Sequence, residues 1–368
     1  MLRAEARVDL NRIRDNVTTL RAGTSAEVMA VVKADGYGHG MLPSARAALA
    51  GGATWLGTAT FEEALTLRAA GIDAPVLAWL WTVGEYDGLR DAVAARVDIS
   101  VNSVRQLRMV GDAARETGTT AQVQLKADTG LSRNGAYETV WADLVRLAGA
   151  TEGVEATGVW SHLACADEPG HPSVERQLAR YREALAHAEA AGLPVRWRHL
   201  GNSAAALILP ETHFDLVRPG IAIYGLSPVE GDHGLVPAMT LCATLANVKR
   251  VRAGEGVSYG HTYTTDRETT LALVPLGYGD GVPRHASNIA PVAVNGRQFR
   301  ISGRVCMDQF VVDVGDLEVS DDDQAVLFGP GTDGEPRAHD WADALGTIHY
   351  EIVTRVGARV PRTYLELA

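Results

Sequence analysis

Eight short apolar runs, separated by longer stretches with helical periodicity, occupy roughly the first two-thirds of the chain. The runs span residues 27–33, 53–59, 74–80, 96–101, 121–128, 154–163, 195–202 and 214–225. The longest helix-compatible stretch between them covers residues 173–192. Alternation of strands with helices is typical of parallel βαβ units. Eight such strands favour a (β/α)8 barrel of the TIM type over an open doubly wound sheet.

The pattern changes after about residue 228, where a connector rich in proline and glycine, "SPVEGDHGLVPAMT", begins. Beyond it the chain consists mainly of β-rich runs with turn residues between them, and helical stretches are scarce. A short helical piece at 340–357 precedes a last strand at 359–367. We therefore expect a barrel domain at 1–230 and a mostly antiparallel β domain at 231–368.

The composition narrows the choice of partners. The chain has 34 Lys and Arg against 45 Asp and Glu, a net charge of −11, which disfavours nucleic acid or an anionic membrane surface as partner. Its three cysteines, Cys165, Cys242 and Cys306, show no metal-binding spacing, and no HExxH is present, so we expect reduced thiols and no metal site. The N-terminal stretch has no apolar h-region, and no apolar run approaches the ~20 residues of a membrane span. These features predict a cytoplasmic protein without membrane attachment.

Polar residues recur at the C-terminal ends of the predicted strands, where active sites form in barrels of this type. In chain order these are Lys33, "KADTGLSR" (126–133), His162, "HLGNSAA" (199–205), and Arg218 with Gly220. Each alone has a structural explanation, such as a charge at the rim, a hydrogen-bonded core histidine or a salt-bridge partner. The same placement on five strands favours a catalytic site at this end of the barrel.

The segment "VVKADGYGHG" (31–40) resembles the cofactor-lysine segment of the alanine racemase family. Further segments similar to that family follow over essentially the whole chain: "KADTGLSRNG", "SHLACADE", "HLGNSAA", "VRPGIAIYG", "VSYGHTY", "LGYGDGVPR", "GRVCMDQ" and "RVPR". The resemblance implies a pyridoxal 5′-phosphate-dependent racemase that interconverts L- and D-alanine and supplies D-alanine for peptidoglycan. Two alternatives are a racemase of broader specificity, acting on serine for example, and a non-catalytic pyridoxal-phosphate-binding barrel protein. The latter lacks a β domain.

The resemblance also implies the catalytic groups. Lysine forms Schiff bases with aldehyde cofactors, and Lys33 matches the family's cofactor lysine. Racemisation needs a second acid–base group on the opposite face of the substrate, and Tyr259 matches the family's tyrosine in that role. A tyrosine with an ordinary pKa of about 10 needs a nearby cation to act near neutral pH; His162 and Arg218 are the candidates. Arg218 is also expected to face the ring nitrogen of the cofactor.

The remaining expected contacts concern the cofactor and the substrate. By resemblance the cofactor is bound by Lys33, Tyr37, His162, Asn202, Ser203, Arg218, Gly220, Ile221 and Tyr350. Arg133 and the backbone N–H of Met307 would bind the substrate carboxylate, and Lys126 aligns with a lysine that is carbamylated in many members. In the family, Tyr259 and Met307 reach the site from the partner subunit, which predicts a homodimer with shared active sites. We assign no role to His39.

Overall fold

The computed structural model describes residues 2–365, and its largest sheet contains eight parallel strands in the order β8-β7-β6-β5-β4-β3-β2-β9. These strands are β2 (Glu27–Val31), β3 (Trp55–Thr58), β4 (Val76–Ala78), β5 (Asp98–Val101), β6 (Ala121–Lys126), β7 (Val154–Trp160), β8 (Trp197–His199) and β9 (Leu216–Val217). Two backbone hydrogen bonds join the outer strands, from Asp215 N–H to the Arg198 carbonyl (3.0 Å) and from Arg218 N–H to the Gly201 carbonyl (2.9 Å). The predicted (β/α)8 barrel is confirmed.

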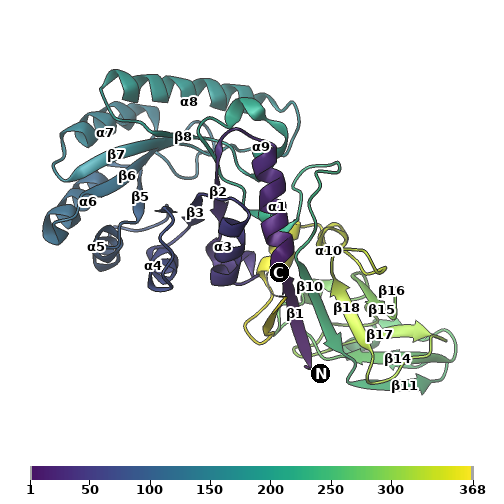
Figure 1. Ribbon diagram of the computed structural model, residues 1–368. Coiled ribbons are helices and arrows are strands. Elements are labelled where there is room, and N and C mark those ends of the chain that lie inside the picture. Colours follow the sequence, from purple (N-terminus) through teal and green to yellow (C-terminus); the bar gives the residue numbers. More distant parts are fainter. Residues whose placement is uncertain (1, 366–368) are drawn as a thin grey trace. The chain divides into compact units, whose positions relative to one another are not determined.

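Helices connect the barrel strands and follow one another around their outside (Figure 1). They are α3 (Met41–Ala50), α4 (Phe61–Ala69), α5 (Tyr86–Ala94), α6 (Val104–Thr117), α7 (Glu138–Ala150), α8 (Pro172–Ala190) and α9 (Ser203–Ile208), and α1 (Leu10–Ala22) precedes β2. A cluster of Met29, Trp55, Leu77 and Leu216, with Trp79 and Trp197 against it, fills part of the barrel interior. The barrel is therefore a packed core, and its chemistry lies at the strand ends.

The remaining strands form smaller sheets. A six-stranded sheet has the order β16-β15-β18-β10-β1-β19, and a three-stranded sheet has the order β11-β14-β17. Their strands are β1 (Ala4–Asp9), β10 (Met239–Thr244), β11 (Asn247–Val251), β14 (Thr269–Val274), β15 (Pro291–Val294), β16 (Arg297–Arg300), β17 (Phe310–Gly315), β18 (Gln324–Phe328) and β19 (Arg362–Leu365). All pairings are antiparallel except that of β1 with β19. Two short strands, β12 (Gly256–Val257) and β13 (Tyr263–Thr264), pair separately, and α10 (Ala338–Leu345) and α11 (His349–Thr354) precede β19.

The chain divides into two units, which we call the barrel unit (residues 13–36 and 41–235) and the β unit (residues 2–12, 37–40 and 236–365). The expected domains were 1–230 and 231–368, whereas this division also assigns residues 2–12 and 37–40 to the β unit. Strand β1 lies inside the six-stranded sheet of the β unit, with Ala4 opposite Ala243 and Ala6 opposite Arg362. Its alternating burial suits a half-buried strand, but its partners lie more than 200 residues away along the chain, beyond the reach of local patterns. None of the helices in residues 2–365 has the length and apolar character needed to cross a membrane.

Candidate active site

Lys33 stands directly after strand β2, at the start of a single left-handed turn, α2 (Lys33–Tyr37). The backbone φ angles of Ala34, Asp35 and Gly36 are 53°, 52° and 62°. Left-handed conformations cost L-residues about 1–2 kcal/mol each, so Ala34 and Asp35 require compensation. Asp35 gains part of it by accepting the Met41 N–H at 2.9 Å.

Glu63, on the first turn of α4, supplies further compensation. One of its carboxylate oxygens accepts the Ala34 N–H at 2.7 Å, and the other accepts the N–H groups of Ala59 (2.8 Å) and Thr60 (3.3 Å). The Thr60 hydroxyl in turn accepts the Glu63 N–H, which completes a capping box. Glu63 thus ties the lysine turn to a well-capped helix.

The Lys33 amine lies half-buried, with its nitrogen 5.9 Å from the centre of the Trp79 ring. Burial lowers the pKa of this amine, and the positive charge of Arg133 lowers it further, while Glu63 acts in the opposite direction. A lowered pKa increases the fraction of neutral amine, the form that attacks a carbonyl. Lys33 therefore has the properties of a nucleophile.

Arg218 follows β9 and lies buried, with 4% of its surface exposed. Its guanidinium donates to the carbonyls of Ser161 (2.6 Å) and Leu200 (3.1 Å) and to the Nδ1 atoms of His199 (3.0 Å) and His162 (3.4 Å). Burial lowers its pKa to about 10, so the group remains positively charged at neutral pH. The charge is held in a fixed orientation.

Both histidines beside Arg218 are neutral. Burial, followed by the charge of Arg218, lowers the pKa of His162 and His199 well below the usual value. Since a guanidinium only donates hydrogen bonds, each histidine accepts at Nδ1 and carries its proton on Nε2. Of the two candidate cations, His162 and Arg218, only Arg218 supplies a positive charge.

Lys126 ends β6, and Arg133 lies exposed in the loop that follows it. Burial, then the charges of Arg218 and Arg133, lower the pKa of Lys126 to about 7. Its amine stands 4.2 Å from the centre of the Trp160 ring. Asp128 shapes the loop by accepting two of its backbone N–H groups, at 3.0 and 3.1 Å. Within residues 2–365, no carboxylate forms an ion pair with Lys126 or Arg133.

Ser203 and Gly220 come together between α9 and the segment after β9. The buried Ser203 hydroxyl accepts the N–H groups of Gly220 (2.8 Å) and Ala222 (3.4 Å). Ile221 is buried and opens a 3₁₀ turn, η2 (Ile221–Tyr224). The side-chain oxygen of Asn202 caps α9, accepting a backbone N–H at 3.1 Å. Three of the expected phosphate contacts, Ser203, Gly220 and Ile221, are thus adjacent.

Tyr37 and Tyr350 lie together in the β unit. Their ring centres are 6.2 Å apart and their planes are tilted by 47°. Tyr37 is buried and Tyr350 is half-buried near the start of α11. The ring of buried His39 contacts the Tyr37 carbonyl at 3.0 Å, which gives that histidine a structural place in the turn.

Tyr259 and Met307, also in the β unit, have 71% and 53% of their surface exposed. The Ser258 hydroxyl, next to Tyr259, donates to the Arg304 carbonyl at 2.7 Å and lies 3.4 Å from the Cys306 sulfur. These contacts join the tyrosine segment to the segment that carries Met307. The exposed side chains of Tyr259 and Met307 therefore lie on two segments that are hydrogen-bonded to each other.

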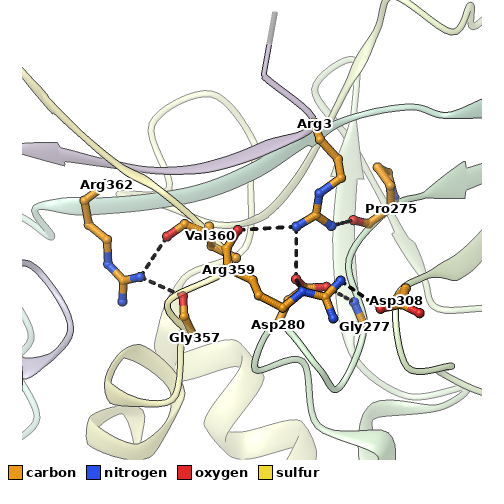
Figure 2. A network of polar contacts seen from close by, with 9 residues as sticks. All are labelled: Arg3, Pro275, Gly277, Asp280, Asp308, Gly357, Arg359, Val360 and Arg362. Atoms are coloured by element: carbon orange, nitrogen blue, oxygen red, sulfur yellow. Dashed lines mark hydrogen bonds and ion pairs between the residues drawn. The ribbon is translucent and has the colours of Figure 1, made fainter.

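The Met307 segment is fixed by a network around the buried carboxylate of Asp280 (Figure 2). Arg359 forms ion pairs with Asp280 (3.3 Å) and with Asp308 (2.8 Å). Arg3 forms a further ion pair with Asp280 at 3.0 Å. The Met307 carbonyl accepts an N–H from the neighbouring turn at 2.8 Å, so the backbone at this position is hydrogen-bonded to that turn.

The barrel unit thus brings together, at the C-terminal ends of its strands, Lys33, Lys126, Arg133, His162, Ser203, Arg218, Gly220 and Ile221, with Asn202 at the α9 cap. Tyr37, Tyr350, Tyr259 and Met307 belong to the β unit. Sequence reasoning missed the polar contacts that support these groups. Glu63 had a local signal, the T-x-x-E pattern of a capping box. His199 opens the segment "HLGNSAA", and nothing in that segment distinguishes this histidine from an ordinary core residue.

Three comparisons describe what the chain is similar to. The family model "Alanine racemase, N-terminal domain" matches residues 8–228, and "Alanine racemase, C-terminal domain" matches residues 238–364. The alanine racemase of Salinispora tropica is 58% identical over 369 residues, 99% of both chains, and that of Thermobifida fusca is 58% identical over 98% of both. Among solved structures, alanine racemase from the D-cycloserine-producing Streptomyces lavendulae has a TM-score of 0.97 and 54% identity over 100% of this chain and 98% of its own. The Streptomyces coelicolor enzyme has a TM-score of 0.97 and 56% identity over 99% and 98%.

Proposed function

The chain belongs to the alanine racemase family and interconverts L- and D-alanine with pyridoxal 5′-phosphate, and we propose that Lys33 and Tyr259 are its two opposed acid–base groups. Removal of the α-proton from one face and its return to the other requires two groups. The observation that carries this proposal is the half-buried amine of Lys33, with its lowered pKa, at the end of β2.

The residues at the barrel mouth fit this cofactor. Lys33, Lys126, Arg133 and Arg218 form no ion pair with a carboxylate in the described chain, so the site attracts anions such as a phosphate and an amino-acid carboxylate. When bound, pyridoxal 5′-phosphate withdraws electrons from the α-carbon of the amino acid. We propose that Lys33 holds its aldehyde carbon. Ser203, Gly220, Ile221, Tyr37 and Tyr350 are the proposed phosphate ligands, with Asn202 beside them.

Arg218 is the proposed partner of the ring nitrogen. Within residues 2–365 its Nη atoms donate to four acceptors, while its Nε–H has no acceptor. That N–H is free to donate to a ring nitrogen. A guanidinium with a pKa of about 10 does not readily transfer a proton to it, so electron withdrawal stays moderate and the proton returns to the α-carbon. This favours racemisation over transamination. His162 stands beside Arg218 as a neutral neighbour of the cofactor.

Substrate binding and partner contacts complete the proposal. Arg133 offers a bidentate guanidinium for the substrate carboxylate, and the Met307 N–H of the partner subunit offers a second contact. Carbamylation of Lys126, whose pKa of about 7 leaves much of the amine neutral, would place a negative charge beside Arg133. The exposure of Tyr259 and Met307 supports a homodimer in which each β unit completes the partner's barrel.

The proposed biological role is supply of D-alanine for peptidoglycan in the cytoplasm. The full-length match to alanine racemases, which includes the β unit, favours this role over a broader racemase or a non-catalytic barrel protein. Alanine is the proposed substrate partner, with no nucleic acid or membrane involved.

The proposal is tested by Tyr259→Phe, with Tyr86→Phe as control because Tyr86 contacts Glu116 on the barrel exterior. We expect Tyr259→Phe to lose racemisation by at least ~100-fold and to retain cofactor, and Tyr86→Phe to behave as wild type. Normal turnover by Tyr259→Phe would refute the two-base assignment.

Subunit exchange tests whether the sites are shared. Neither Lys33→Ala nor Tyr259→Phe homodimers should be active, but mixed dimers contain one site with both residues intact if Tyr259 serves the partner. Random mixing should then restore about one quarter of the active sites, since half the dimers are mixed and half of their sites are complete. No recovery on mixing would show that each subunit uses its own tyrosine.

A further inference from the structure

A line of four hydrogen-bonded polar side chains crosses the barrel core beneath Arg218. The guanidinium Nη1 contacts His199 Nδ1 at 3.0 Å, and His199 Nε2 contacts the Gln124 side-chain oxygen at 2.6 Å. The Gln124 side-chain nitrogen contacts the Asp98 carboxylate at 2.8 Å. Arg218, His199, Gln124 and Asp98 are exposed by 4%, 0%, 0% and 8%. We call this set the core relay.

The core relay has only one self-consistent direction. Arg218 only donates, so His199 accepts at Nδ1 and carries its proton on Nε2. That proton is donated to the carbonyl oxygen of the Gln124 amide, and the amide NH₂ is then donated to Asp98. A carboxylate only accepts, so both ends of the line impose the same direction on the two groups between them.

The surroundings hold the core relay in place. The Trp160 ring stacks on His199, with centres 5.6 Å apart and planes within 2°, and the Arg218 guanidinium lies 4.9 Å from the same ring. Thr157 contacts Asp98 at 3.5 Å. Burial raises the pKa of Asp98 to about 6, although Gln124, Thr157, Arg68 and Arg196 act to lower it.

Burying four polar side chains in a barrel interior costs desolvation free energy, which apolar side chains in the same positions would not incur. Asp98 forms no ion pair within residues 2–365 that would offset its burial. The core relay therefore contributes little to stability compared with an apolar core, and its benefit is orientation.

We propose that Asp98 and Gln124 are positioning residues that lock His199 in its Nε2–H tautomer and thereby aim Arg218. This inference rests on the cofactor contact proposed for Arg218. Without Asp98 only Arg218 still imposes the direction, and the Gln124 amide loses the acceptor that holds its NH₂ away from His199, so the amide can rotate and present that NH₂ to His199. The imidazole then accepts at Nε2 and moves its proton to Nδ1, where it opposes an Arg218 N–H.

The first test reads the tautomer directly in the wild-type enzyme by ¹⁵N NMR of histidine-labelled protein, with His199→Gln identifying the signals. We expect neutral His199 with its proton on Nε2. A proton on Nδ1, or a charged imidazolium at neutral pH, overturns the core relay without any core substitution.

The second test compares Asp98→Leu, Asp98→Asn and Gln124→Leu in the cofactor-loaded enzyme, with Gln122→Leu as the matched control. Gln122 lies on the same strand but contacts Glu155 instead. Misplacing a catalytic group by about 1 Å costs up to ~100-fold in rate, so Asp98→Leu and Gln124→Leu should lower kcat by about 10- to 100-fold. KM should stay within about threefold, because the proposed carboxylate ligands are unaltered. Asp98→Asn, whose amide oxygen still accepts from Gln124, should retain most of kcat.

The ratio of transamination to racemisation, together with the variant Arg218→Lys, separates failure of the core relay from failure of the role proposed for Arg218. Asp98→Leu and Gln124→Leu should transaminate more often per racemisation than wild type, whereas Gln122→Leu should not. If Arg218→Lys keeps normal kcat and the normal ratio of the two reactions, the role proposed for Arg218 fails. If Arg218→Lys is impaired while the Asp98 and Gln124 variants match Gln122→Leu, only the core relay is overturned.

Discussion

The sharpest structural prediction concerns Glu63→Ala, which removes the carboxylate that joins the Lys33 turn to helix α4. Three backbone N–H groups, those of Ala34, Ala59 and Thr60, lose their acceptor. A hydrogen bond to a charged group contributes about 1.5–3 kcal/mol, and a helix cap about 1 kcal/mol. Ala34 is exposed, so water can accept its N–H and offset part of the hydrogen bond that is lost. We expect the free energy of unfolding of the barrel unit to fall by about 3 kcal/mol.

Tryptophan fluorescence during urea unfolding measures this loss, because six of the seven tryptophans lie in the barrel unit. Glu62→Ala is the matched control, since Glu62 is the exposed neighbour of Glu63 on the same helical turn. Glu63→Gln keeps only one acceptor oxygen and should lose about half as much stability. The visible absorbance of bound cofactor should decline with Glu63→Ala. The left-handed conformation of the Lys33 turn costs about 1–2 kcal/mol per L-residue, and without Glu63 a hydrogen bond that offsets this cost is lost. Equal unfolding free energies for Glu62→Ala and Glu63→Ala would refute the reasoning.

Three further predictions follow from other contacts. In CO₂-free buffer the wild type should gain about 2 kcal/mol of unfolding free energy relative to Lys126→Met between pH 7 and 9. The reason is that the Lys126 amine, with a pKa of about 7 in the folded protein, loses its proton over this range, whereas the same amine in the unfolded chain stays charged. Urea unfolding of both proteins at both pH values measures this gain, and an equal difference at pH 7 and 9 would contradict it. Ser203→Ala removes the hydroxyl that accepts the N–H groups of Gly220 and Ala222, and it should raise the Kd of the cofactor about tenfold. Fluorescence titration measures this Kd, and an unaltered value would mean that the phosphate binds elsewhere. Gly38→Ala should destabilise the β unit by about 1–3 kcal/mol in calorimetry, because φ at Gly38 is 81° and a Cβ there would overlap the Val353 carbonyl. Gly71→Ala is the control, since Gly71 has a similar φ of 76° but open space around the position of a Cβ. Equal losses of stability in the two variants would count against the overlap.

The barrel was predictable because its signals are local. Each strand and helix shows its own periodicity, and all eight predicted strands occur, although they are shorter than expected. The run 214–225 illustrates the limit, because only Leu216–Val217 pairs as a strand and Ile221–Tyr224 forms a 3₁₀ turn. Pro219 and Gly220 interrupt the ladder, since proline lacks the N–H that a strand needs. Strand β1 was missed because its partners come from the far end of the chain.

The lysine proposed for the active site was visible in the sequence, but its supporting contacts were not. Lys33 stands at a strand end within a specific motif, whereas Glu63 supports it through the backbone N–H of Ala34, 29 residues away. Asp98 and Gln124 occupy ordinary positions in apolar strands, and only the closure of the barrel brings them into line with His199. Such residues carry no motif, because their role depends on which strands are neighbours.

The crowding of positive charge around Lys33 has two consequences that act at different stages of binding. Before substrate arrives, burial and the charge of Arg133 lower the pKa of the Lys33 amine, which favours the neutral, nucleophilic form. We propose that the charge of Arg133, which forms no ion pair with a carboxylate within residues 2–365, also attracts the substrate carboxylate. On that proposal, a carboxylate bound at Arg133 would screen the largest charge that depresses the pKa of Lys33, and the amine would become a stronger base. If Arg133 binds the carboxylate as proposed, one arginine would favour a nucleophilic Lys33 in the free site and a proton-accepting Lys33 in the filled one.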